Sequence, residues 1–258
     1  MSRSNKGSSS SASPIKRYIS YSGSTGKFNY WDKDKEERVD LDTLDIVVLD
    51  VKASISGFNE SLGARISSNM VTSTGKEPFK VICFSNGKAL VQSEGLYKDI
   101  KDEIRGYGGK FTTNVLAVAD VGYGSEVVNV QLSGGALGNW IDFGKDLEGG
   151  DIYDHQITFK QGILSKREKG KSVPVTKKEE DKLEAEFKKN PRFRAPIWFY
   201  TVAFDTSGLT EEQGEEADVQ DKVLQKFFAS KLESTKATPE LVAEPEADDS
   251  DDNEDLPF

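Results

Sequence analysis

Four cationic side chains and several aromatic ones recur along β-branched segments of this chain, and their chemistry suits binding rather than catalysis. Lys52, Arg65, Lys80 and Lys110 can neutralise phosphate groups, while aromatic rings beside them can stack on nucleobases of any identity. Together they predict a surface for a single-stranded nucleic acid. The full set expected on this surface is Lys27, Tyr30, Trp31, Lys52, Arg65, Lys80, Tyr107, Lys110 and Phe111.

Strand alternation predicts where these side chains point. Over residues 44–58, Val47, Leu49, Val51, Ala53 and Ile55 share one face, which leaves Lys52 on the opposite face. The same alternation turns Arg65 outward, and it gives Lys80 the parity of Ile82 and Phe84, at the rim of the sheet. The aromatic residues leave an alternative open, because each taken singly also suits a core position.

The sequence contains few residues that could carry out catalysis. Cys83 is the only cysteine and lies in an apolar run, and His155 is the only histidine, so we expect neither a nucleophile nor a zinc site. The "LDVK" stretch at 49–52, with Asp42 and Asp45 upstream, bears a weak likeness to a metal-dependent nuclease cluster. The glycine-rich 132–140 either cradles a phosphate or forms a tight turn. We expect no catalytic residue, metal or cofactor.

The elements that must position the cations follow the order strand, strand, strand, helix, strand, strand. Strands are expected at 44–58, 64–71, 78–85, 110–120 and 126–134, and a helix with a glycine stop at 95–110. This order predicts a mainly β protein with a five-stranded OB-fold barrel, although small α+β sheets share it.

Further elements follow the predicted barrel. We expect a helix near 136–147, a strand near 155–164, a charged helix near 176–190 and a strand at 195–204. The last expected element is an amphipathic helix whose apolar stripe packs on the barrel. The stripe consists of Val219, Val223, Leu224, Phe227, Phe228 and Leu232.

Charge is segregated along the chain. The net charge is −10, but residues 240–258 hold nine acids and no base, so the rest carries 34 bases against 35 acids. Residues 1–31 hold bases only, and 160–194 are also basic. We therefore expect a flexible Ser-rich basic N-terminus at 1–26, an OB-fold domain at 27–235, and a disordered acidic interaction tail at 236–258. Without a membrane span or signal core, we expect a cytoplasmic protein with no membrane partner.

The C-terminal segment ends in Leu256, Pro257 and Phe258 after a run of acids, an arrangement suited to docking in a pocket that also binds the terminal carboxylate. The partner-binding residues expected there are Asp251, Asp252, Glu254, Asp255, Leu256, Pro257 and Phe258. The sequence "DDNEDLPF" (251–258) resembles the terminal tail of bacterial single-stranded DNA-binding proteins. The stretches 94–118 and 132–143 are similar to the single-stranded DNA-binding proteins of tailed bacteriophages.

This resemblance implies an OB-fold, binding of single-stranded DNA without sequence preference, and a role in replication, recombination or repair. It also implies that the tail contacts a polymerase, helicase, primase or recombinase, in the bacterial host cytoplasm if a phage encodes the protein. A second hypothesis is an adaptor or inhibitor whose acidic tail imitates DNA while the body binds none. The basic segments at 1–31 and 160–194 favour the first hypothesis.

Overall fold

The structure, a computed structural model, describes residues 13–85, 88–147, 150–168, 171–189 and 198–236. Its twelve strands join into one sheet, and the helices come between or after them along the chain. In chain order they are β1 (Arg17–Ser22), β2 (Lys27–Asp32), β3 (Glu37–Leu41), β4 (Thr43–Asn59), β5 (Ala64–Ser68), β6 (Phe79–Ser85), β7 (Lys88–Gly95), α1 (Tyr97–Gly106), β8 (Gly109–Asp120), β9 (Ser125–Ser133), α2 (Gly134–Asp146), the 3-10 turn η1 (Ile152–Asp154), β10 (His155–Glu168), β11 (Lys171–Pro174), α3 (Lys177–Lys189), β12 (Trp198–Gly208) and α4 (Glu211–Lys236).

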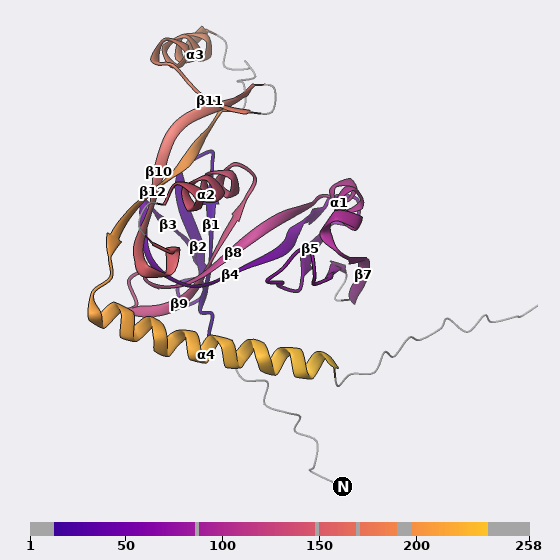
Figure 1. Cartoon of the computed structure of the whole chain (residues 1–258). Coiled ribbons are helices and arrows are strands. Elements are labelled where there is room, and N and C mark those ends of the chain that lie inside the picture. The colour runs from indigo at the N-terminus through magenta and orange to yellow at the C-terminus, as the bar shows by residue number, and fades with distance from the viewer. Residues whose placement is uncertain (1–12, 86–87, 148–149, 169–170, 190–197, 237–258) are drawn as a thin grey trace, which may run out of the picture.

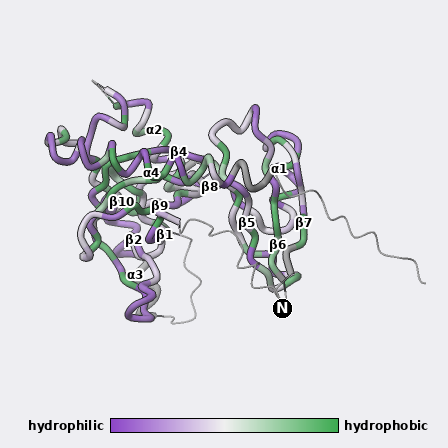
Figure 2. Tube along the Cα trace, turned by 90° about the horizontal axis from the view of Figure 1, so that it is seen from below, coloured by the Kyte–Doolittle hydropathy of each residue, from purple (hydrophilic) through white to green (hydrophobic). Residues whose placement is uncertain are grey.

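The sheet is open and divides into two lobes joined by the long antiparallel pair β4 and β8 (Figure 1). Its main path runs β3-β2-β1-β9-β8-β4-β5-β6-β7, and β10 pairs with β4 and with β12. The large lobe contains β1–β3, β9, β10, β12 and α2, whereas the small lobe contains β5–β7 and α1. Seen from below in Figure 2, the two lobes lie side by side with β4 and β8 between them.

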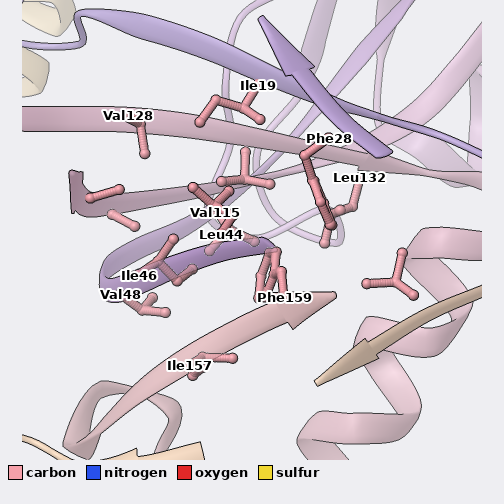
Figure 3. Close-up of a cluster of buried hydrophobic side chains, with 14 of the residues drawn as sticks. Ile19, Phe28, Leu44, Ile46, Val48, Val115, Val128, Leu132, Ile157 and Phe159 are labelled. Atoms are coloured by element: carbon pink, nitrogen blue, oxygen red, sulfur yellow. The ribbon is translucent and has the colours of Figure 1, made fainter. Parts of the chain in front are cut away.

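The large lobe encloses the main hydrophobic core. Alternate residues of its curved strands point inward, and the labelled side chains of Figure 3, among them Ile46, Val115 and Phe159, gather from different strands around this core. Helix α2 closes one side, because Trp140 is buried against Phe159 with ring centroids 5.5 Å apart. The curvature also brings the β1–β2 turn to β12, where the Tyr200 amide donates to the Gly23 carbonyl at 2.7 Å.

The small lobe has its own core on the same side of the sheet. Phe79 and Ile66 of the strands are fully buried against Ile100 and Ile104, which lie on one face of α1. The four-residue spacing of these isoleucines is the signal by which the sequence predicts this helix. Helix α1 therefore covers the inner face of the small lobe (Figure 1).

A β-bulge in β4 changes which of its residues face inward. Leu44, Ile46 and Val48 face the main core, then the pairing with β8 shifts between Val48 and Asp50. One extra residue reverses the parity of everything after it, so Val51 returns to the inner face. The sequence prediction that Val47 and Leu49 share a face with Val51, Ala53 and Ile55 is therefore wrong, since uninterrupted alternation cannot register a bulge.

Helix α4 packs on the outer face of the large lobe, along β4 and β8 (Figure 1). Leu224 is fully buried against the outward-facing Leu49, Leu116, Val118 and Val127, with Ile15 beside them. The predicted apolar stripe thus packs in part. Leu224 and Phe228 contact the sheet, whereas Val219 and Val223 are exposed. The Leu232 side chain lies outside the part of the chain that the structure describes.

Most predicted elements are confirmed, but their assembly differs from the prediction. The strands at 44–58, 64–71, 78–85, 110–120 and 126–134 and the helix within 95–110 are all present. The strands within 64–85 form the small lobe instead of closing a five-stranded barrel with the others, and the sheet stays open. Residues 17–22, expected in the flexible segment 1–26, form β1 and pair with β2 and β9. No helix of the described residues is long and apolar enough to cross a membrane.

Candidate nucleic-acid interface

The outer face of the small lobe gathers cations and aromatic rings in neighbouring rows. Strand register places Phe58 of β4 opposite Arg65 of β5, and Arg65 opposite Phe84 of β6. Lys110 of β8 lies opposite Ser56, in the next row. Lys80 has the same parity on β6 as Phe84. We call this surface, defined by Phe58, Arg65, Lys80, Phe84 and Lys110, the open face.

The two phenylalanines of the open face are unusually exposed for their size. Phe58 is 54% and Phe84 48% exposed, although a Phe on a strand is ordinarily buried. They flank Arg65, which is exposed, on the two strands beside it. Strand spacing sets the rings about 10 Å apart. A cation between two exposed rings can contact a phosphate while the rings stack on the bases at either side.

The cations of the open face are free to act on a ligand. Within the described residues, Arg65, Lys80 and Lys110 are exposed and take part in no ion pair. Glu94 of β7 lies opposite Lys80 in the register and moderates the local charge. The open face is therefore cationic on its β4, β5 and β8 side and closer to neutral toward β7.

A pocket of about 510 Å³ opens at the end of this surface. Phe58 and Lys110 contribute to its wall together with Arg105 and Tyr107, which lie at the end of α1, and with Glu60. Close backbone packing forms its floor, since a Cβ on Gly57 would lie 2.3 Å from the Gly108 carbonyl oxygen.

Tyr107 and Phe111, both predicted for the binding surface, differ in their surroundings. Burial raises the pKa of Tyr107 above its ordinary value, and its hydroxyl is 2.8 Å from the Ser93 hydroxyl, so only part of the ring lines the pocket. Phe111 faces inward and packs against Tyr97 with ring centroids 4.8 Å apart. Phe111 occupies the core position that the sequence left open as the alternative.

Lys52 is not on the open face, although its parity on β4 is the outward one. Its ammonium group lies 2.9 Å from the Asp50 carboxylate and 2.9 Å from the Thr72 hydroxyl. It also lies 4.9 Å from the ring centre of Phe228 on α4. The prediction of an exposed Lys52 is wrong because α4, which packs over this part of the sheet, encloses the side chain.

The three predicted residues of β2 lie in the large lobe, separated from the small lobe by β1, β9, β8 and β4. Tyr30 is buried in the main core, with the Arg17 guanidinium 5.0 Å from its ring centre. The Lys27 ammonium group lies 3.0 Å from the Asp42 carboxylate and donates a hydrogen bond to it, which raises the pKa of Lys27. Trp31 is exposed opposite Arg38. They do not join the open face.

Several bases of the two basic segments form ion pairs with acids where the structure describes them. Arg17 pairs with Glu126, Lys160 with Asp205, and Lys166 with Glu168 and Glu179. The hydrogen bond that Lys166 donates to the Glu179 carboxylate is the main reason why the pKa of Glu179 falls to about 2. The net charge of a segment therefore overstates the positive charge that is available to a ligand.

The residues considered for nuclease chemistry do not form a cluster. Asp42 pairs with Lys27, Asp45 accepts a hydrogen bond from Thr158, and Asp50 contacts Lys52 and Gln225. Among the described residues, no group of three or more His, Cys, Asp or Glu side chains could hold a metal ion. The glycine-rich 132–140 is the tight turn from β9 into α2, with Gly134 at a φ of 57°.

Sequence reasoning missed Phe58 and Phe84, although a signal for each was present. Phe84 has the outward parity of Lys80, and Phe58 has that of Ser54 and Ser56, opposite to the inward Ile55. The predicted partner-binding residues, Asp251, Asp252, Glu254, Asp255, Leu256, Pro257 and Phe258, lie outside the described residues. No family model, curated protein or solved structure matches this chain.

Proposed function

We propose that this protein binds single-stranded DNA without sequence preference and that the open face is its principal binding surface. The observation that carries the proposal is the grouping of Phe58 and Phe84, both exposed, around Arg65, with Lys80 and Lys110 nearby. Aromatic rings can stack on the bases of a single strand whatever those bases are, whereas duplex DNA keeps its bases stacked inside the helix. Cations without ion-pair partners then hold the phosphates.

Strand order supports a partly open OB-type arrangement, although with different elements from those expected. The elements β4, β8, β9, α2, β10 and β12 follow the order of an OB-fold, with the helix after the third strand. In this assignment β5–β7 and α1 form an insertion between the first two strands. OB-folds bind oligonucleotides beside that loop and the loop between the last two strands. The open face would then belong to an enlarged binding loop.

The C-terminal segment completes the proposed function. Its acids and terminal Leu-Pro-Phe would recruit a replication, recombination or repair protein to the coated strand, in the cytoplasm of a bacterial host if a phage encodes the chain. The described residues do not include this segment, so its role rests on the sequence pattern.

Fluorescence anisotropy with labelled single-stranded and duplex oligonucleotides tests the proposal. Phe58→Ala and Phe84→Ala should each weaken single-strand binding about 5- to 150-fold, since one stacked base contributes about 1–3 kcal/mol. Arg65→Glu should weaken binding and lower the salt dependence, because each phosphate contact adds about 0.7 to the slope for single strands. Because these three positions are exposed, the substitutions should leave thermal stability almost unchanged.

Matched controls separate the open face from general charge and hydrophobicity. Like Arg65→Glu, Lys98→Glu replaces a base with an acid, but on α1, at an exposed position of the small lobe away from the outer face. Tyr18→Ala removes an exposed ring in the large lobe. Both should leave binding nearly intact. Equal affinity of the wild-type chain for duplex and single strand, or equal losses in the controls and the open-face variants, would contradict the proposal.

A further inference from the structure

Strand β8 has a free edge next to the open face. Its neighbour β9 ends at Ser133, whose pairing partner on β8 is Thr112. Residues 109–111 of β8 therefore pair with β4 on one side and, within the part of the chain that the structure describes, with no strand on the other. Because no strand closes the sheet there, an extended chain can pass at this edge from the outer face to the inner side.

A pocket of about 280 Å³, which we call the notch, lies along this free edge between the two lobes. The small lobe contributes Tyr97, Arg105, Lys110 and Phe111 to its wall, and α2 contributes Gly134 and Leu137. Arg105 and Lys110 also line the larger pocket at the end of the open face. Two cations are thus common to both pockets, and the notch continues the open face toward the large lobe.

A further pocket of about 170 Å³, the far pocket, lies on the other side of the first turn of α2. Ser133, Gly135 and Ala136 line it, and they alternate along the chain with the two residues of α2 that line the notch. The large lobe completes its wall with Tyr21, Gly23, Arg167, Phe199 and Tyr200. Phe199 fills the space between two glycines, since a Cβ on Gly23 or on Gly135 would lie 3.4 or 3.5 Å from its side chain.

The charges of the notch and the far pocket favour an anionic ligand. Among the described residues, no acid lines either pocket, although acids outnumber bases 44 to 34 in the chain. Arg167 is exposed and pairs with no described acid, because the adjacent Glu168 pairs with Lys166. Arg105 lies 3.9 Å from Asp102, but such an exposed pair contributes little, so a phosphate can replace the carboxylate.

We propose that a single strand bound at the open face continues through the notch into the far pocket, where Arg167 contacts a phosphate and Phe199 stacks on a base. This inference rests on the proposed function and adds the course that the strand takes across the molecule. A cation and an aromatic ring occur together at each stage of that course, as binding of a single strand without sequence preference requires. A long strand therefore contacts both lobes, whereas a short one is held at the open face alone.

Anisotropy titrations of the full chain with single strands of about 6 and about 20 nucleotides test this course. Arg167→Glu should weaken binding of the longer strand by about tenfold or more and lower its salt slope by about 0.7. Affinity for the shorter strand should stay within about twofold of wild type. Phe199→Leu keeps an apolar side chain between the two glycines but removes the flat ring, and it should also weaken binding of the longer strand alone.

Lys33→Glu is the matched control for Arg167→Glu. Lys33 is also an exposed base without an ion-pair partner among the described residues, but it follows β2 at the end opposite to Gly23. Its substitution should leave both affinities nearly unchanged. Equal effects of the two charge reversals, or equal losses for both lengths, would overturn the course and leave the open face in place. If the wild-type chain bound neither strand, the proposed function would fail as well.

Discussion

Replacing Leu224 with alanine should loosen α4 from the sheet. Leu224 is fully buried among Leu49, Leu116, Val118 and Val127, residues of the outer face that would otherwise meet water. Removing a buried leucine side chain costs about 2–5 kcal/mol, through lost transfer free energy and the cavity left behind. In a chain of this length each kcal/mol lowers the melting temperature by about 2–4 °C, so we expect a fall of about 4–20 °C.

Thermal and urea unfolding monitored by circular dichroism measure this effect, and Val223→Ala provides the control. Val223 precedes Leu224 on the same helix but is exposed, so its truncation should change the free energy of unfolding by no more than about 0.5 kcal/mol. If the two variants lost equal stability, or if Leu224→Ala lost none, the packing of α4 on the outer face would be wrong.

Three further predictions follow from individual contacts. The Tyr123 hydroxyl donates to Asp32, which lowers the pKa of Asp32 from 3.8 and raises the pKa of Tyr123 to about 12. Asp32 therefore loses its stabilising contribution as the pH falls below about 3.8, and Tyr123 loses its own as the pH rises from 10 to 12. Tyr123→Phe should reduce the loss of stability at both pH extremes. An unchanged dependence of stability on pH would count against the contact. Gly57→Ala forces its Cβ against a backbone oxygen and should lower the free energy of unfolding in urea by about 1–3 kcal/mol. Gly75→Ala, with open space around it, should lower it little. Equal effects would argue against close strand packing. Lys52→Ala should leave single-strand affinity within about twofold in anisotropy titrations because α4 encloses this lysine; a loss as large as that of Arg65→Ala would contradict the enclosure.

Local periodicity predicted the elements because each signal lies within a few residues. The spacing of Ile100 and Ile104 marked α1, and the β-branched run after Thr43 marked β4. The segment from 17 to 41 was not recognised as three strands. Charged residues such as Asp34, Lys35 and Glu36 interrupt its alternation, and in the structure they form the β2–β3 turn.

The assembly of the elements could not be predicted, because long-range pairing decides it. Strand β4 is 17 residues long and changes neighbours along its length, from β10 and β8 to β8 and β5. Nothing local in the sequence marks that change, so the strands of the small lobe were assigned to a single barrel. The bulge after Val48 and the cover that α4 places over Lys52 likewise depend on tertiary contacts.

For the candidate site, strand alternation predicted exposure correctly where a strand is regular and no helix packs over it. Arg65, Lys80 and Lys110 are exposed on one outer face as expected. The aromatic residues expected on the surface include Tyr30 and Phe111, which lie in the two cores. Orientation on the strand decides whether a ring is exposed, and it turns Phe111 inward and Phe58 outward.

Photo-cross-linking tests the central claim most directly. A single-stranded oligonucleotide containing iodouracil, irradiated with the wild-type chain, should attach to aromatic residues that stack on its bases, and mass spectrometry identifies the peptides. We predict cross-links in the peptides that contain Phe58 and Phe84, with no comparable yield from the same oligonucleotide in a duplex. Cross-links confined to Tyr18 and Trp31 of the large lobe, or equal yields from the duplex, would contradict the assignment of the open face.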